Sequence, residues 1–190
     1  MENENILHVK NMVCQRCIKA VSRCLANLEI DYDSISLGQV QLKAPLSEVV
    51  KRDLALLLTN DGFELLTDKS SQLIEQIKSL IIGIVHYEAV EPDSNLSDYL
   101  AKELLHEYNY LSRLFSSVEG ITIEKYVIQQ KVERVKELLI YDELTPTEIA
   151  YKMNYSSLQH LSTQFKKITG LSPRAFKNQL QQERKALDEI

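Results

Sequence analysis

Residues 145–177, TPTEIAYKMNYSSLQHLSTQFKKITGLSPRAFK, decide the fold of the larger part of this 190-residue chain. The stretch opens with a strong helix start made by Thr145, Pro146 and Glu148. A threonine caps the helix, a proline suits the first helical position, and a glutamate three residues after the cap can reach back to it. The pattern predicts a first helix over residues 146–153.

A tight turn and a second helix are expected next. Asn154 tolerates the left-handed conformation at a helix end. Ser156 or Ser157 then supplies a new cap, and Gly170 suits the end of the second helix. Two short helices joined by a tight turn have the size of a helix-turn-helix.

The second helix is expected to have two faces. The apolar stripe comprises Leu158, Leu161, Phe165 and Ile168. The polar face comprises Gln159, Ser162, Thr163 and Lys166. Glutamine can pair bidentately with adenine, and lysine neutralises phosphate. An ordinary solvated face is the alternative for four polar residues alone, but the cap, the turn and the glycine together favour DNA recognition.

The pattern also occurs fifty residues earlier. The apolar and glycine positions Leu111, Phe115, Gly120 and Tyr126 recur as Leu161, Phe165, Gly170 and Phe176. Such an internal repeat indicates one supersecondary unit used twice. A doubled unit presents two similar surfaces to a ligand that itself repeats, and duplex DNA is such a ligand.

Both copies resemble the double helix-turn-helix of the AraC/XylS family of bacterial transcription regulators. Residues 95–126, NLSDYLAKELLHEYNYLSRLFSSVEGITIEKY, resemble the first helix-turn-helix, and residues 145–177 resemble the second. The resemblance extends from about Ser71 to Lys177 and implies sequence-specific DNA binding. It places the base-reading positions at Asn109, Ser112 and Arg113 in the first copy and at Gln159 and Thr163 in the second.

Arg113 is the favoured base-reading residue, because arginine to guanine is the commonest specific contact. The alternative is a surface arginine paired with Glu107 or Glu119. The second copy departs from the family pattern at Asn154, where glycine is usual, and at Thr163, where a longer side chain is common. Its half-site is therefore expected to be read more weakly.

A joining helix is predicted over residues 123–139, and its apolar stripe comprises Ile128, Val132, Val135 and Leu139. Seventeen residues at about 1.5 Å each make a rod of roughly 25 Å. This is a suitable strut between recognition helices that lie about one DNA turn, roughly 34 Å, apart. The charges of the strut are expected to be solvated surface.

Charge is unevenly distributed along this chain of net charge −5. Residues 146–185 carry +5, whereas residues 70–145 carry −6. Non-specific DNA affinity comes mainly from lysine and arginine contacts to phosphate. The second helix-turn-helix is therefore expected to supply most of the electrostatic attraction to DNA.

The first seventy residues have a different pattern. Strands are expected at residues 6–10, around a tight turn at Gly38, and at residues 62–66. One helix carries the stripe Cys17, Val21, Cys24 and Leu28, and another, over about 46–60, carries Val50, Leu54 and Leu57 inward. The order strand-helix-strand-strand-helix-strand predicts a ferredoxin-like βαββαβ domain, so the fold class is α+β with an all-α double helix-turn-helix domain after it.

In that setting the run Met12-Val13-Cys14-Gln15-Arg16-Cys17 resembles the heavy-metal-associated (HMA) domains of soft-metal chaperones and transport ATPases. The resemblance covers roughly Ile6 to Leu66 and includes the pair Gly62-Phe63. It departs from the family at Asn11, where glycine is usual. The resemblance implies a metal site at the two cysteines.

The chemistry of Cys14 and Cys17 also favours a soft metal ion. A helix N-terminus and Arg16 both favour thiolate over thiol. A thiolate pair suits Cu(I) or another soft ion, while zinc requires two further ligands. His8 is expected to face solvent, and Cys24 is most simply a core thiol. A redox pair and a degenerate domain with retained cysteines are the alternatives.

The predicted domains are residues 1–69, residues 70–180, and a polar tail over residues 181–190. Three cysteines and no signal-like N-terminus favour a reducing cytoplasm, and the longest apolar run, near Leu80–Val85, is too short to span a membrane. The sequence has no catalytic Ser-His-Asp set, phosphate loop or paired carboxylates, so no enzymatic activity is expected.

The sequence as a whole predicts a cytoplasmic, bacterial AraC-type regulator that binds double-stranded DNA and responds to a soft metal ion. RNA polymerase and a second copy of the chain are further candidate partners. Two alternatives stay open: a soft-metal carrier whose helical half docks partners, and a regulator whose N-terminal domain only dimerises.

Overall fold

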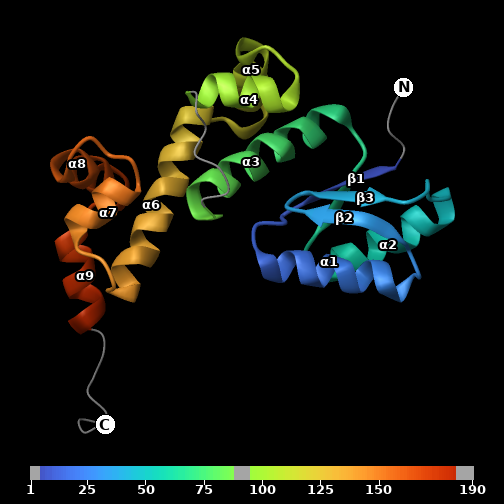
Figure 1. Ribbon diagram of the computed structural model, residues 1–190, viewed down its shortest axis with the longest axis horizontal. Helices are drawn as coiled ribbons and strands as arrows, with labels where there is room; N and C mark the ends of the chain where they lie inside the picture. The colour runs from blue at the N-terminus through green and yellow to red at the C-terminus, as the bar shows by residue number, and fades with distance from the viewer. Residues whose placement is uncertain (1–4, 88–94, 183–190) are drawn as a thin grey trace, which may run out of the picture. The chain divides into compact units, whose positions relative to one another are not determined.

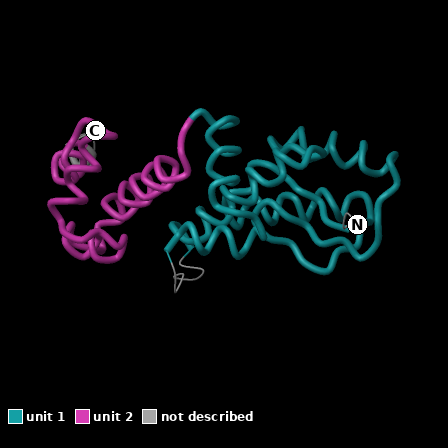
Figure 2. The backbone as a smooth tube through the Cα atoms, turned by 90° about the horizontal axis from the view of Figure 1, so that it is seen from above, with its two compact units in different colours: residues 1–120 teal, residues 121–190 magenta. Residues whose placement is uncertain are grey.

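The computed structural model describes residues 5–87 and 95–182 of the chain. It divides into two compact units, residues 1–120 and residues 121–190 (Figure 2). The domains predicted from the sequence motifs, residues 1–69 and residues 70–180, stay a prediction. Residues 183–190 of the predicted polar tail lie outside the described residues.

The N-terminal unit begins with a small α/β layer structure (Figure 1). Its elements are β1 (Ile6–Lys10), α1 (Gln15–Asn27), β2 (Tyr32–Ser36), β3 (Gln39–Leu42), α2 (Glu48–Asn60) and β4 (Glu64–Leu66). The strands form one antiparallel sheet in the order β2-β3-β1-β4. In the register, Leu7 of β1 lies opposite Val40, and Val9 lies opposite Leu65.

Helices α1 and α2 cover one face of this sheet. Successive side chains of a strand point to opposite faces, and the apolar ones on this face are buried against the two helices. The central residues Val9, Val21 and Leu54 are fully buried. The inward positions predicted for α2 are confirmed, since Leu54 is fully buried and Val50 and Leu57 pack against the core. Leu58, which was not predicted, is also fully buried.

The opposite face of the sheet is covered by helix α3 (Lys69–Tyr87). His8 on β1 is therefore only 9% exposed, and the prediction that it faces solvent was wrong. Burial lowers the pKa of His8. The tight turn at Gly38 approaches α3 so closely that a Cβ there would lie 2.6 Å from the Ser79 hydroxyl. A larger residue would require the Ser79 side chain to move, and the φ of 75° also favours glycine.

Helix α3 also packs against α4 (Leu96–Leu104) and α5 (Tyr108–Glu119), which complete the N-terminal unit. The C-terminal unit consists of α6 (Ile123–Tyr141), α7 (Pro146–Lys152), α8 (Leu158–Thr169) and α9 (Pro173–Gln182). Helix α6 packs against each of the other three and buries Val132, Val135 and Leu139. Within the described parts of the chain, no helix is long and apolar enough to cross a membrane.

Candidate nucleic-acid interface

Helices α5 and α8 are two copies of one element. Each has 12 residues, and each ends at a glycine in the left-handed conformation, Gly120 or Gly170. The paired phenylalanines Phe115 and Phe165 are almost completely buried at equivalent positions. The structure thus has the repeat that the sequence predicted.

The second helix-turn-helix begins with the predicted capping box. The Glu148 N–H donates to the Thr145 hydroxyl at 3.3 Å, and the Thr145 N–H donates to Glu148 Oε2 at 2.7 Å. Hydrogen bonds from the hydroxyl and the N–H of Thr145 lower the pKa of Glu148. Asn154 takes the left-handed conformation in the turn, with φ 54°, and Ser157 caps α8. These local predictions are confirmed.

The polar face of α8 lies open. Gln159, Thr163 and Lys166 are exposed, and Ser162 is half-buried. The Thr163 hydroxyl donates to the Gln159 carbonyl at 2.9 Å, so this short side chain is held against its own helix. The predicted apolar stripe was partly wrong, because Leu158 is 38% exposed and Ile168 is 41% exposed. Both lie near an end of the helix.

A lysine from α6 holds the turn before α8. Lys131 Nζ donates to the Met153 carbonyl at 2.9 Å and lies 5.4 Å from the centre of the Tyr155 ring. The Tyr155 hydroxyl in turn donates to Gln164 at 2.6 Å. Burial lowers the pKa of Lys131 and raises the pKa of Tyr155.

The prediction that the charges of the joining helix are solvated was therefore wrong for Lys131. A signal was present in the sequence, because Lys131 lies three residues after Ile128 and four before Val135. This spacing places it on the apolar stripe of the helix. A long side chain on such a stripe can extend to a polar group beside the core.

The first helix-turn-helix has a different turn. Asn95 caps α4 by accepting the Asp98 N–H at 2.9 Å. The turn residue Leu105 has φ 54° and is 88% exposed, and it precedes the N-cap Glu107 by two positions. In the second copy the left-handed Asn154 precedes its N-cap Ser157 by three. The two turns therefore present their recognition helices with different loops.

The predicted base-reading residues of α5 also lie on its surface. Asn109 and Arg113 are exposed, and Ser112 is half-buried. Arg113 Nε donates to the Asn109 carbonyl at 3.2 Å. Glu119, one of its alternative partners, instead pairs with Lys78 at 2.7 Å. Among the described residues Arg113 forms no ion pair, so its guanidinium is available to a ligand.

The cysteine loop, residues 11–17, enters helix α1. Cys14 is the N-cap of α1, and its Sγ lies 3.4 Å from Cys17 Sγ; both thiols are free and half-buried. The Cys17 N–H and thiol hydrogen bonds, together with Arg16, lower the pKa of Cys14. Asn11 has φ 72°, a conformation that asparagine tolerates.

The donors in this loop fit an ion that accepts two thiolates. Over residues 5–87 and 95–182, no group of three or more His, Cys, Asp or Glu residues is placed to hold a metal. Two thiolates are donors that a soft ion can accept, whereas tetrahedral zinc would require two further ligands. Cys24 is 4% exposed and donates to Asp61 at 3.6 Å, as expected for a core thiol, and burial raises its pKa.

Known proteins match the helical part of the chain. Residues 100–179 match the family model described as "Helix-turn-helix domain". The uncharacterized HTH-type transcriptional regulator YtdP of Bacillus subtilis (strain 168) is 30% identical over 124 residues, which are 64% of this chain and 16% of YtdP. The chain thus spans less than a fifth of the length of this relative.

Two solved structures have the same helical fold. The C-terminal domain of AraT, a response regulator from Geobacillus stearothermophilus, has a TM-score of 0.50 and 28% identity, covering 59% of this chain and 88% of that chain. A transcriptional regulator from Chromobacterium violaceum, described as an AraC-type DNA-binding domain-containing protein, has a TM-score of 0.50 and 23% identity. It covers 58% of this chain and 93% of that chain.

Proposed function

From the AraC-type helix-turn-helix domain in its C-terminal half, we propose that this chain is a sequence-specific, DNA-binding transcription regulator. The observation that carries the proposal is the repeat of α5 and α8, each ended by a left-handed glycine and each with an exposed polar face. Two such faces match a duplex that presents two half-sites. The relatives are themselves regulators of the helix-turn-helix type, which supports the same function.

In this function the exposed side chains divide into two roles. Arg113 and Asn109 on α5 and Gln159 on α8 have the donors and acceptors that read base edges. Lys166 would neutralise a phosphate, and the short hydroxyls of Ser112, Ser162 and Thr163 would support either contact. RNA polymerase and a second copy of the chain are the protein partners that such a regulator would use.

Selection of bound sequences from a random DNA pool tests this function. We expect the full chain to enrich one motif, and the enrichment to weaken as salt rises. Enrichment of no motif, with binding of Cu(I) retained, would instead favour the carrier function, in which the helical half docks partners.

We further propose that the N-terminal layer is a ferredoxin-like, HMA-like domain that makes the regulator responsive to a soft metal. Its strand order β2-β3-β1-β4 and its two helices on one face of the sheet support the fold. Cys14 and Cys17 would hold the ion, which would supply a positive charge shared by two thiolates at the start of α1. A resident metal would thus act through structure rather than through catalysis.

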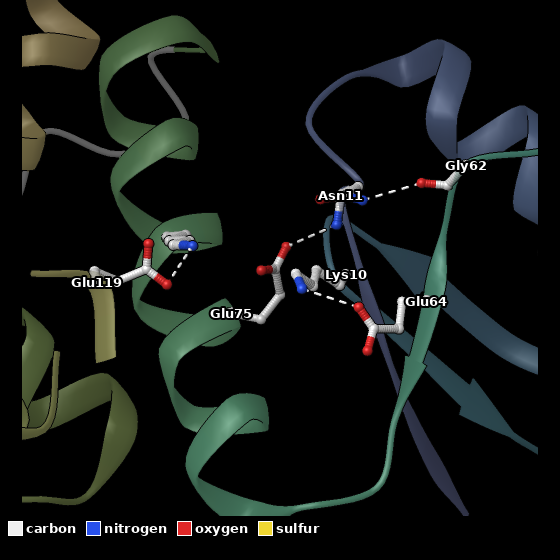
Figure 3. Close-up of polar contacts among 7 residues, drawn as sticks. Lys10, Asn11, Gly62, Glu64, Glu75 and Glu119 are labelled. Atoms are coloured by element: carbon white, nitrogen blue, oxygen red, sulfur yellow. Dashed lines mark hydrogen bonds and ion pairs between the residues drawn. The ribbon is translucent and has the colours of Figure 1, made fainter. Parts of the chain in front are cut away.

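Helix α3 connects the cysteine loop to the first helix-turn-helix, as Figure 3 shows in part. The Asn11 N–H donates to Glu75 at 3.1 Å, and the Tyr87 hydroxyl donates to the Val13 carbonyl at 2.8 Å. On the same helix Lys78 pairs with Glu119, the last residue of α5, at 2.7 Å. These contacts support the proposal that a change in the cysteine loop would alter the packing of α3, the helix that supports α5.

DNA titrations with and without Cu(I) test the metal response. We expect operator affinity to change at least a few-fold in the native chain, since couplings of about 1–3 kcal/mol are typical. The Cys14→Ser/Cys17→Ser variant should lose the change, and Cys24→Ala should keep it because Cys24 lies in the core. Identical titrations of the native chain with and without Cu(I) would show that the domain does not sense this metal.

A further inference from the structure

A groove of about 710 Å³ lies between helix α1 and the edge strand β2, and it begins beside the cysteine pair, at Arg16. Figure 1 shows both elements at the N-terminal, blue end of the chain. Three cations line it: Arg16, Lys19 and Arg23. No acidic side chain is part of its lining.

These cations form one stripe on α1. Spacings of three and four residues put them on the same helix face, spread over about 10 Å at 1.5 Å per residue. All three are exposed, and in the described part of the chain none of them forms an ion pair. Helix α1 contains no Asp or Glu that could relieve their mutual repulsion.

The stripe is unusual for its surroundings. Residues 1–120 carry eleven basic and eighteen acidic residues, for a net charge of −7. Other lysines of this unit are neutralised within it, since Lys10 pairs with Glu64 and Lys51 pairs with Glu48, both at 2.9 Å. The three cations of the stripe have no such pair among the described residues, so they leave a local positive field in an acidic unit.

The rest of the groove supplies hydrogen bonds and apolar walls. The Ser22 and Tyr32 hydroxyls lie 2.9 Å apart and fix each other at its edge. Ile18 and Ile35 are half-buried and present methyl groups beside the cations. A ligand for this groove therefore has negative charge at one end and an apolar body at the other.

We propose that this groove binds a small anion that carries a phosphate or several carboxylates on an apolar body. DNA phosphates have the same charge chemistry, so the test below separates a small anion from a DNA duplex. A small anion with an apolar body fits a groove that combines three cations with two isoleucines. None of the groove residues belongs to the predicted base-reading set, so the proposal does not rest on the proposed function.

A titration of the full chain with 1-naphthyl phosphate, followed by amide chemical shifts in NMR, tests the proposal. We expect saturable shifts at residues 16–23 and 32–35. Lys19→Gln/Arg23→Gln should weaken binding at least tenfold, because two of the three cations are removed. The matched control Arg52→Gln removes an exposed cation of α2 outside the groove and should leave the affinity unchanged.

Three outcomes would overturn the proposal: shifts confined to α8 and α9, absence of saturation, or equal affinity of the double variant and the native chain. A DNA arm separates the two sources of phosphate. Shifts at the groove with a DNA duplex but not with 1-naphthyl phosphate would make the groove a DNA contact instead. Unchanged operator affinity in the double variant, measured in parallel, would keep this result independent of the proposed function.

Discussion

Arg113 is the residue whose replacement should change base preference most clearly. Its side chain is exposed on α5, and among the described residues its one hydrogen bond goes to the Asn109 carbonyl. Arg113→Ala is expected to cost about 1–3 kcal/mol on the selected sequence and to relax preference at one base position. Competition binding with single-base variants of that sequence measures this.

The control for Arg113→Ala is Ser117→Ala on the same helix. The Ser117 hydroxyl already donates to the Leu114 carbonyl. The control variant should bind DNA as the native chain does. Equal weakening of Arg113→Ala on all sequences, with base preference intact, would assign Arg113 to phosphate contact.

Lys131 should matter for both stability and DNA binding. Lys131→Ala removes the donor to the Met153 carbonyl and the cation beside the Tyr155 ring. We expect the free energy of unfolding to fall by about 1–3 kcal/mol, because a partly buried carbonyl loses its charged partner. DNA affinity should fall as well, since these contacts hold the turn before α8. Urea unfolding and DNA titration measure the two effects.

Lys136→Ala is the matched control for Lys131, because it removes a lysine of the same helix that pairs with the exposed Glu133 at 2.7 Å. Such surface changes usually stay within about 0.5 kcal/mol. Equal destabilisation by the two alanines would contradict a special role for Lys131.

Single residues were predictable from the sequence where the reason is local. The Thr145 cap and the left-handed Asn154 depend on neighbouring backbone groups, and both are confirmed. The surroundings of His8 and Lys131 depend on segments more than twenty residues away. Helix α3 covers His8, and the Met153 carbonyl accepts a hydrogen bond from Lys131. Alternation within a strand cannot show that a helix later in the chain covers its second face.

At the scale of elements, α3 should carry a pH-dependent contribution to stability. Burial raises the pKa of Glu75, which is 6% exposed and accepts the Asn11 N–H. Its charged neighbours are Lys10 on β1 and Lys78 on α3, which lower the pKa, and Glu119 on α5, which raises it. The folded state therefore binds the proton more tightly than the unfolded state does.

Stability from protonated Glu75 is consequently fully present below the ordinary glutamate pKa and is lost as pH rises through the raised value. Glu75→Gln, which keeps an acceptor for the Asn11 N–H, should be more stable than the native chain at pH 7, on the order of 1 kcal/mol. The difference should vanish below about pH 4. Urea unfolding between pH 4 and pH 8 measures it, and a constant difference over this range would disprove the role of this carboxyl.

The same helix shows how far elements could be predicted. The order of the first six elements, the fifty-residue repeat and the joining helix were all read correctly from periodicity, and α6 extends two residues beyond its predicted end. Helix α3 buries Leu73, Ile77 and Ile81 among others, since it contacts both the sheet and the helices α4 and α5. An apolar pattern on several faces indicates burial but does not name the partners.

For the whole molecule, the distribution of charge predicts which helix-turn-helix contributes more to the salt dependence of DNA binding. Residues 146–185 carry +5 and residues 70–145 carry −6. Lysines within residues 146–185 act in a positive field, whereas the charges of lysines within residues 70–145 are offset by nearby carboxylates. Removing a cation that neutralises one phosphate should reduce the slope of log affinity against log salt by about 1.

Lys166 is an exposed residue of α8. We therefore expect Lys166→Gln to reduce that slope by about 1 and to weaken binding to all sequences alike. Lys102 is an exposed residue of α4. Lys102→Gln removes the same charge from the acidic region and should reduce the slope much less. Filter binding from about 50 to about 200 mM salt, on the selected sequence and on an unrelated duplex, measures both. If Lys102→Gln reduces the slope as much as Lys166→Gln does, the first helix-turn-helix contacts phosphate despite its acidic surroundings, and net regional charge is not what decides the attraction.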